Sequence, residues 1–285
     1  MKKLLLAMTA VAALTCPSLA ADMAVKARPV VAPIMTWTGF YVGINGGAAA
    51  MSDPSMSYVD GAINAYVPVT VTGTSSASGI AGFHAGYNYQ MPNNWVFGIE
   101  GDWDWTNLKS SAAPGLLCSG PPFRVQCGGV SVLTDNAFMQ TQVNWLASVR
   151  GRLGYASSQW LLYGTGGVAF ADVGYTGNLN CTGTPPTFCL GGAQAMRSSA
   201  SETRVGFVVG GGGEFKLSQN WILGAEYLFY HFEGDATSTA GWTTVATGAP
   251  APFFECGTGQ NCGHFTYRGF DVHTGRVRLS YQFQP

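Results

Sequence analysis

Three acidic residues, Glu100, Asp102 and Asp104, stand two positions apart in the sequence, where their carboxylates could act together. A pair of carboxylates is the acid and base of most glycoside hydrolases, so Glu100 and Asp102 raise the question of sugar hydrolysis. Residues two apart lie on one face of a β-strand, and the surrounding sequence implies no sugar-binding cleft. We therefore expect these carboxylates to pair with basic side chains of a neighbouring strand.

Basic residues with the same two-residue spacing occur later in the chain, at Arg150 and Arg152 and again at Arg276 and Arg278. The charged residues that we expect to point inward are Glu100, Asp102, Asp104, Arg150, Arg152, Glu214, Lys216, Glu226, Arg276 and Arg278. Side chains nearly fill the interior of a barrel of eight strands, and opposite charges buried there form a hydrogen-bonded plug. Structural filling is the favoured interpretation, and a narrow ion path or gate is the alternative.

Six cysteines fall in three close pairs, and none is expected in a strand. The pairs are Cys118 with Cys127, Cys181 with Cys189, and Cys256 with Cys262. Cysteines of an exported protein are oxidised, so three disulfides within loops are the simplest interpretation, although pairing between loops stays open. A bridge over roughly ten residues adds on the order of 2–3 kcal/mol in the chain-entropy model. Metal binding is the alternative, but CxxC spacing is missing and histidines are few, so we predict no metal site and no cofactor.

Histidine together with serine is the other combination that could do chemistry. The four histidines are His84, His231, His264 and His273. Small outer-membrane barrels include acyltransferases and lipid A deacylases, which need a His and a Ser near the outer rim. His231 and His273 lie at the loop-proximal ends of their predicted strands, but no spacing ties a Ser to either of them. We therefore do not expect an enzyme.

Strands must position these side chains, and the sequence contains eight aromatic segments whose residues alternate between two faces. They are Trp37–Ala48, Gly79–Gln90, Trp95–Leu108, Val143–Tyr155, Trp160–Tyr175, Thr203–Leu217, Trp221–Glu233 and Val272–Phe283. A tilted membrane strand needs about 9–11 residues, which every segment supplies. In the third segment Trp95, Phe97 and Ile99 alternate with Val96, Gly98 and Glu100. A strand separates these two sets, whereas a helix would mix them.

Short and long connections alternate strictly between the eight segments. Three tight polar turns, at 91–94, 156–159 and 218–220, each lead into a tryptophan, namely Trp95, Trp160 and Trp221. The other four connections are long, at about 49–78, 109–142, 176–202 and 234–271. Short periplasmic turns and long extracellular loops are typical of a transmembrane barrel. The three tryptophans fit an aromatic girdle at the periplasmic interface.

The composition fits a chain that faces lipid on one side and a lumen on the other. Charged residues make up only 10% of the chain and aromatic residues 13%, and 39 of 285 residues are glycine. A typical soluble domain has about 25% charged residues. Without Lys2 and Lys3, 12 basic residues face 15 acidic ones. This balance gives no electrostatic basis for binding nucleic acid.

The first twenty residues have the form of a secretory signal peptide. Lys2 and Lys3 precede the apolar run Leu4–Leu14, and Ser18-Leu19-Ala20 supplies small residues for cleavage after Ala20. The run is shorter than the roughly 20 residues of a transmembrane helix. A lipoprotein signal ending at Cys16 is the alternative, but Thr15 precedes that cysteine where a Gly or Ala is usual. Residues 21–36 are rich in Ala, Val and Pro, which indicates an extended periplasmic lead-in.

Four stretches resemble a known family of small outer-membrane proteins. These are the lead-in Ala21–Lys26, the opening strand Trp37–Gly43, the stretch Leu161–Ala169 and the closing strand Val277–Phe283. They are similar to the outer-membrane immunogenic, porin-like proteins of alphaproteobacteria such as Brucella and rhizobia. The resemblance covers the signal peptide and all eight strands but not the loops. Such proteins usually end on the aromatic residue that the assembly machinery reads, whereas Gln284 and Pro285 follow Phe283 here.

The resemblance also implies a candidate ligand, because some relatives of that family are reported to bind haemin. It would make His264 or Tyr267, in the last long connection, a candidate axial ligand. The favoured interpretation of both residues is that they are solvated loop residues.

The sequence thus predicts an all-β protein with one barrel domain, residues 37–285, in which eight antiparallel strands close by pairing the first with the last. An open sheet edge could not face lipid. We expect a surface-exposed outer-membrane protein with a structural role in the envelope and with antigenic or adhesive loops. A narrow porin-like channel and a receptor for haemin or a host ligand are the alternatives. The expected partners are outer-membrane lipids and lipopolysaccharide, the outer-membrane assembly machinery, and host surface ligands.

Overall fold

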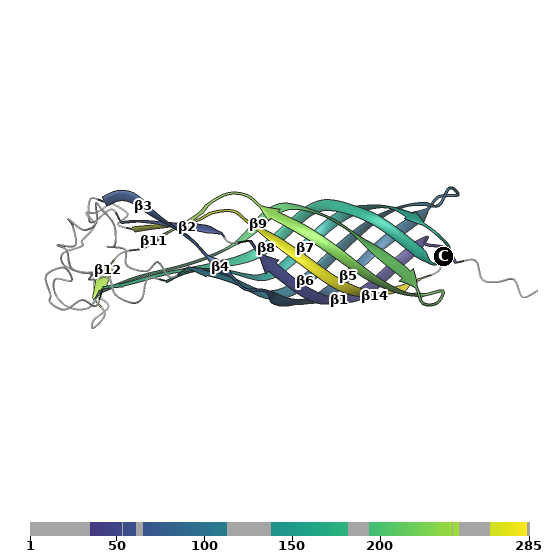
Figure 1. Ribbon diagram of the computed structural model, residues 1–285, viewed down its shortest axis with the longest axis horizontal. Coiled ribbons are helices and arrows are strands. Elements are labelled where there is room, and N and C mark those ends of the chain that lie inside the picture. Colours follow the sequence, from purple (N-terminus) through teal and green to yellow (C-terminus); the bar gives the residue numbers. More distant parts are fainter. Residues whose placement is uncertain are drawn as a thin grey trace, which may run out of the picture. The chain divides into compact units, whose positions relative to one another are not determined.

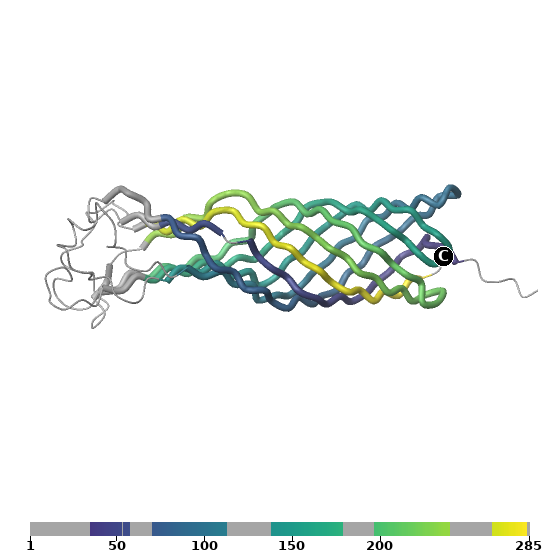
Figure 2. Tube along the Cα trace, viewed as in Figure 1, coloured from purple at the N-terminus to yellow at the C-terminus, as the bar shows by residue number. Residues whose placement is uncertain are grey.

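A closed ring of eight antiparallel strands forms the barrel. The computed structural model describes residues 35–52, 54–60, 65–112, 138–181, 194–240, 242–244 and 263–283. The predicted signal peptide and residues 21–34 lie outside this part of the chain. The ring consists of β1 (Gly39–Met51), β5 (Ser78–Gln90), β6 (Trp95–Ala112), β7 (Phe138–Ala156), β8 (Trp160–Cys181), β9 (Gln194–Lys216), β10 (Trp221–Phe232) and β14 (Phe270–Gln282). Figures 1 and 2 show these strands winding around a common axis.

The first and last strands close the ring, as predicted. β1 and β14 pair without interruption from Tyr41 opposite Gln282 to Met51 opposite Val272. Every other ring strand pairs with its neighbours along the chain, and β10 pairs with both β9 and β14. A closed ring leaves no strand edge whose unpaired N–H and C=O groups would meet lipid. In the part of the chain that the structure describes, no helix has the length and apolar character needed to cross a membrane.

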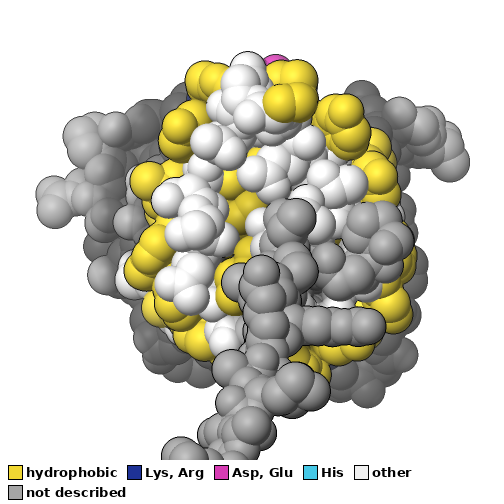
Figure 3. Space-filling model, turned by 90° about the vertical axis from the view of Figure 1, so that its right-hand side faces the viewer, with side chains coloured by type: hydrophobic (Ala, Val, Ile, Leu, Met, Phe, Trp, Pro, Cys, Tyr) yellow, Lys and Arg dark blue, Asp and Glu magenta, His cyan; other side chains and the backbone are white. Residues whose placement is uncertain are grey.

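Side chains on each strand alternate between the lipid side and the lumen. On β14, Arg276 and Arg278 are buried, whereas Val277 between them is 59% exposed. The same alternation on β10 buries Glu226 and exposes Tyr227. Figure 3 looks at the end of the barrel that carries the short turns, where hydrophobic side chains line the rim. The outward apolar side chains suit an acyl-chain environment.

At the short-turn end, the first strand begins later than predicted. It starts at Gly39 and not at Trp37, because the side chain of Trp37 turns into the lumen and is fully buried. Gly39 has a φ of 143°, a value that residues with a side chain rarely adopt, and this bend separates Trp37 from the strand. Trp37 packs with Val96, Leu161 and Ile222.

At the opposite end, four strands run well past the predicted boundaries. β6, β7, β8 and β9 contain 18, 19, 22 and 23 residues, about twice what a membrane crossing needs. The pairing of β8 with β9 continues to Cys181 opposite Gln194. The expectation that no cysteine lies in a strand is therefore wrong for Cys181, because the backbone ladder does not stop where the lipid stops. The other five loop cysteines lie outside the described residues, so the disulfides stay a prediction.

A second, four-stranded sheet forms from stretches that the sequence assigned to long connections. Its order is β11 (Ala236–Ala240), β13 (Gly263–Tyr267), β2 (Ser55–Asp60) and β3 (Ala65–Thr72). Two short strands extend the ring itself, since β4 (Thr74–Ser75) pairs with β6 and β12 (Trp242–Thr244) pairs with β9. The second sheet, which we call the outer sheet, lies at the end of the barrel away from the short turns (Figure 1).

The inner face of the outer sheet packs on the inner face of the extended ring strands. The ring of Tyr267 lies 4.7 Å from that of Tyr175 on β8. Phe265 covers Gly177, where an added Cβ would come within 2.7 Å of the phenyl ring. Ser198 on β9 and Ser238 on β11 share a hydrogen bond. The two sheets therefore form a sandwich that continues the barrel beyond the membrane.

An apolar core fills the outer half of the barrel and this sandwich. It includes Met51, Met56, Ile80, Leu108, Met139, Val143, Leu146, Val173, Tyr175, Val208, Leu228, Tyr230, Phe232, Phe265, Tyr267, Phe270 and Val272. We call this set the outer core. All of its members are at most 5% exposed, so the lumen here is packed as in a soluble protein.

Enlarging Gly177 is expected to disrupt the outer sandwich and to spare the barrel. In Gly177→Val the new side chain collides with Phe265, and such overpacking typically costs about 1–3 kcal/mol. Gly174→Val on the same strand is the matched control, because an added Cβ there meets nothing within 4 Å. Limited proteolysis of the folded protein should cut the outer segments faster in Gly177→Val only. Equal cleavage of both variants would contradict the packing of β13 on β8.

Candidate functional site

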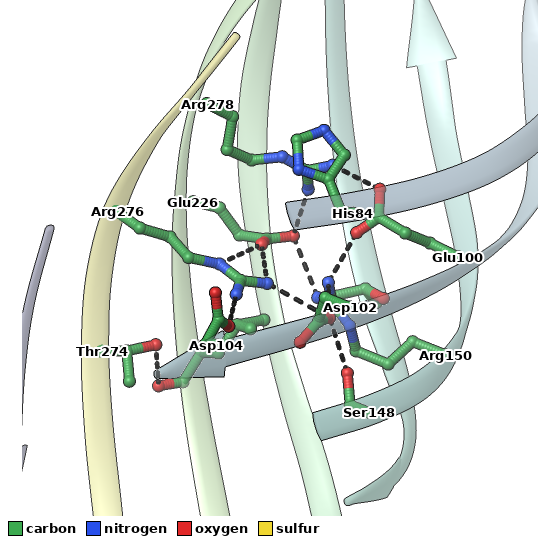
Figure 4. Close-up of polar contacts among 12 residues, drawn as sticks. His84, Glu100, Asp102, Asp104, Ser148, Arg150, Glu226, Thr274, Arg276 and Arg278 are labelled. Carbon is green, nitrogen blue, oxygen red and sulfur yellow. Dashed lines mark hydrogen bonds and ion pairs between the residues drawn. The ribbon is translucent and has the colours of Figure 1, made fainter. Parts of the chain in front are cut away.

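Charged side chains fill the middle of the lumen, and Glu226 of β10 lies at their centre (Figure 4). Its Oε1 accepts hydrogen bonds from Arg150 Nη1 at 3.0 Å and from Arg278 Nη1 at 2.9 Å. Its Oε2 accepts from Arg276 Nε at 2.9 Å and Nη2 at 2.8 Å. One carboxylate thus binds three guanidinium groups, which come from β7 and β14.

The acids of β6 bind the same arginines from the other side of the lumen. Arg150 Nη2 lies 2.5 Å from Glu100 Oε1 and 2.7 Å from Asp102 Oδ2. Arg276 pairs with Asp104, and its Nη2 lies 3.3 Å from Asp102 Oδ2. Arg278 pairs with Glu100. Charge-assisted hydrogen bonds of this kind are the stronger class in proteins.

Several of these ion pairs join strands that are not neighbours. β14 and β6 are separated by β1 and β5, and yet Arg276 reaches Asp104. β7 and β10 are separated by β8 and β9, and yet Arg150 reaches Glu226. The sequence predicted acid–base pairing between adjacent strands only. An eight-stranded ring is narrow enough for an arginine to span it, so each guanidinium binds two walls at once.

Arg152 extends the charged layer towards the short-turn end. Its Nη2 lies 2.6 Å from Glu214 Oε1 on β9, and its Nη1 lies 3.3 Å from Glu100 Oε2. Arg152 Nη1 also donates to the Tyr41 hydroxyl at 2.6 Å, and that hydroxyl donates to Glu100 Oε2 at 2.7 Å. The guanidinium carbon stands 3.8 Å from the ring centroid of Tyr163, a cation–π contact.

Four arginines and five carboxylates make up this ion-pair network. Its members are Glu100, Asp102, Asp104, Arg150, Arg152, Glu214, Glu226, Arg276 and Arg278. Each of these residues is at most 6% exposed. Removing charges from water is costly, and hydrogen bonding to several opposite charges offsets that cost. Removing one member alone leaves its partners uncompensated.

Lys216, which the sequence placed among the inward charges, lies apart from the network. Its Nζ donates to Thr36 O at 2.7 Å and to Gln282 Oε1 at 2.6 Å, and stands 5.0 Å from the ring centroid of Trp37. No described carboxylate lies within ion-pair distance of it. Lys216 stands one inward position beyond Glu214, nearer the end of β9, and there its ammonium group meets Thr36 and Trp37 and not the arginines. Trp37 and Lys216 therefore close the short-turn end of the lumen.

The structure also adds residues that the sequence did not single out. Tyr41 and Tyr163 bridge acids and arginines, and Ser148 donates to Asp102 at 2.7 Å. His84 is buried in the lumen, where its Nε2 and Ser280 Oγ share a hydrogen bond of 2.8 Å. Neither Tyr41 nor Tyr163 was assigned to a face of its predicted strand from the sequence. A two-residue alternation of side chains also carries no sign of which opposite side chains such a tyrosine would meet.

The three tryptophans after the short turns point away from the lumen. Trp95, Trp160 and Trp221 are 42%, 57% and 46% exposed. Trp95 packs edge-on against Tyr155, and Trp221 packs edge-on against Tyr281. Their position at one end of the barrel is the one that an interfacial aromatic girdle requires.

Of the two candidate haem ligands, Tyr267 is misjudged as a solvated loop residue. It lies in β13 with its side chain in the outer core, 1% exposed, because the outer sheet turns it inward. Burial raises the pKa of the Tyr267 phenol above its usual value, which opposes the phenolate that iron binding would need. His264 lies in the same strand and is partly exposed.

The remaining histidines bind local partners on the outer surface. His231 Nδ1 lies 2.5 Å from Asp271 Oδ1, and the Tyr227 hydroxyl lies 2.6 Å from His273 Nδ1. Neither contact includes a serine. Among the residues that the structure describes, no group of three or more His, Cys, Asp or Glu side chains is arranged to hold a metal ion.

Comparison with known proteins gives relatives of one kind. A family model described as "Outer membrane protein beta-barrel domain" matches residues 9–283. The chain is 33% identical over 236 residues to the 31 kDa outer-membrane immunogenic protein of Brucella melitensis biotype 1, covering 80% of this chain and 86% of that protein. It is 29% identical over 148 residues to a 22 kDa outer membrane protein of Rhizobium leguminosarum bv. viciae, covering 52% and 50%.

Among solved structures, the outer membrane protein OprG of Pseudomonas aeruginosa is similar over 87% of this chain and 97% of its own, with a TM-score of 0.41 and 11% identity. At that level the likeness says nothing about function.

Removing the charge at the centre of the network is expected to destabilise the barrel. In Glu226→Gln three arginines lose a shared carboxylate, and breaking a buried pair in this way typically costs about 3–5 kcal/mol. Glu233→Gln, directly after the end of β10 and with a side chain 86% exposed, is the matched control and should change little. Urea unfolding of protein refolded into lipid vesicles measures both. If Glu226→Gln unfolds at the urea concentration of the control, the network does not stabilise the fold.

Proposed function

Because the chain belongs to the outer membrane protein β-barrel family and lies in the outer membrane, we propose that it is a non-conducting surface protein. The barrel anchors the chain in the bilayer, and the extended strands and outer sheet carry a recognition surface beyond it. The observation that supports this proposal is that side chains fill the lumen throughout the part of the barrel that the structure describes.

Three layers of side chains close the lumen. Trp37 and Lys216 occupy the short-turn end, together with Val96, Leu161 and Ile222. The ion-pair network fills the middle. The outer core fills the other half and continues into the sandwich. A water-filled porin needs a far wider ring, with about 16 strands.

A narrow channel, the alternative from the sequence, would have to pass all three layers. Ions could exchange places with charges in the network, but the outer core is built mainly from packed apolar side chains, with isolated polar groups such as Thr141 and the Tyr230 hydroxyl among them. Moving an ion through such a region without water is expensive. This is why a closed barrel is the better proposal.

The outer sheet supports the surface role through its outward face. Thr237, Thr266, Ser57 and Thr70 stand in one row across its four strands. These side chains are exposed or half-exposed, so this row of the face is polar and uncharged. The Brucella relative is named an immunogenic outer-membrane protein. We propose the same kind of exposure for this chain, with adhesive or antigenic contacts at the outer sheet.

A conductance measurement tests whether the lumen is closed. Protein refolded into planar bilayers, at a loading where a general porin gives many unitary steps, should give no steps above the membrane background. Folded insertion is checked on the same sample by its heat-modifiable migration on gels. Reproducible unitary currents from the folded protein would overturn the proposal in favour of a channel.

A further inference from the structure

Irregular pairing marks the point where the ring strands leave the apolar zone. The register of β6 on β7 shifts between Trp105 and Leu108, and that of β7 on β8 shifts between Val143 and Trp145. Val143 and Leu146 are both fully buried, so the two residues between them, Asn144 and Trp145, both face outward. Bulges of this kind redirect side chains and are common beside functional sites.

A chain of polar side chains runs across the outward face just beyond this point. Gln142 Nε2 donates to Asn107 Oδ1 at 3.1 Å and to Asn144 Oδ1 at 2.9 Å. Asn144 Nδ2 donates to Asp172 Oδ2 at 2.8 Å, and Gln140 Nε2 lies 3.4 Å from Gln142 Oε1. We call these five residues the amide ladder. They come from three strands, and their mutual hydrogen bonds hold them in fixed orientations.

Indole rings lie next to the amide ladder on its membrane side. Trp145 follows Asn144 directly and stacks on Trp103 with ring centroids 4.3 Å apart. Trp105, opposite Trp145, is 56% exposed. Tryptophans gather where acyl chains meet headgroups, and outward residues nearer the barrel middle, such as Ile99 and Val149, are apolar. The amide ladder therefore stands at the height of the headgroups.

An open notch lies in the same surface. Gly174 of β8 pairs with Gln142 on one side and Ser201 on the other, and an added Cβ there meets nothing within 4 Å. Side chains of the ladder thus line one side of a gap in the face. Space for at least a methyl-sized group is therefore open beside Gln142.

We propose that the amide ladder binds the sugar headgroup of a glycolipid in the outer leaflet. An amide has two N–H donors and a carbonyl acceptor. Gln142 uses both donors within the ladder, but Gln140 and Asn144 each donate only once there. Their second N–H groups and the carbonyl oxygens match sugar hydroxyls, and the neighbouring indoles suit the apolar face of a sugar ring. Phosphate is a poorer match, because Lys109, opposite Gln142, is the one basic residue of β6 from Trp105 onward. The ladder continues the lipid-facing surface, so its occupant is a lipid of that leaflet and not a soluble sugar.

The test compares binding of a purified rough-type lipopolysaccharide with binding of phosphatidylglycerol, each added to detergent-purified full chain and detected by native mass spectrometry. Gln142→Ala combined with Asn144→Ala should weaken glycolipid binding by about tenfold, the effect of losing two neutral hydrogen bonds. Phosphatidylglycerol binding should not change. Gln159→Ala, an exposed amide in a short turn at the other end, is the matched control and should bind like the unaltered chain.

A second variant tests glycolipid binding without changing any residue of the amide ladder. Gly174→Val fills the notch, keeps every amide, and should weaken glycolipid binding while the barrel stays heat-modifiable. Unchanged glycolipid binding in both folded variants would overturn the proposal. So would equal binding of phosphatidylglycerol by the unaltered chain, or equal competition by the free core oligosaccharide. The closed lumen does not depend on any of these results, since the conductance measurement tests it separately.

Discussion

Closure of the backbone ladder is the constraint from which the other features follow. Lipid offers no hydrogen bonds, so every strand must pair on both edges and the sheet must become a ring. Eight strands make the narrowest such ring in common use, and its interior has room for side chains but little else. Glycines occur where the space between neighbouring side chains is smallest. A Cβ on Gly43 would lie 2.5 Å from the His84 ring, and one on Gly212 would lie 2.7 Å from the Tyr163 hydroxyl.

The narrow lumen also explains why charges can occupy it. A single buried carboxylate would be too costly, but Glu100, Asp102 and Glu226 each bind an arginine on a neighbouring strand and another on the far wall. The arginines have the length and planar geometry for this, since one guanidinium donates to two or three acceptors at once. A lysine in their place would offer all its donors from a single ammonium nitrogen. The network therefore specifies which walls face each other, in addition to filling space.

The strands, their inward faces and their closure could be predicted from the sequence, because they depend on a two-residue period and on the lengths of connections. The two-residue period holds no information about which side chains meet across the lumen. The period could not predict the ion pairs of Arg276 with Asp104 and of Arg150 with Glu226, because the strands that carry them are not neighbours. The strands of the outer sheet were not predicted from the sequence, for a different reason. Its strands β11 and β13 have five residues each, and β2 pairs with a segment about two hundred residues away. Lys216 shows the remaining limit, since its inward direction was predicted but its partners in the lead-in were not.

The pairing of β2 with β13 has a consequence for anything that binds the outer face. Ser57 and Thr266 stand side by side on one surface, although one belongs to the first long connection and the other to the last. Neither segment alone presents that surface, so an antibody raised against the folded protein at this face would fail to recognise a peptide from either segment. The two strands that make this face, β2 and β13, lie directly after β1 and directly before β14, whose pairing closes the ring. The outer face is thus a marker of completed assembly.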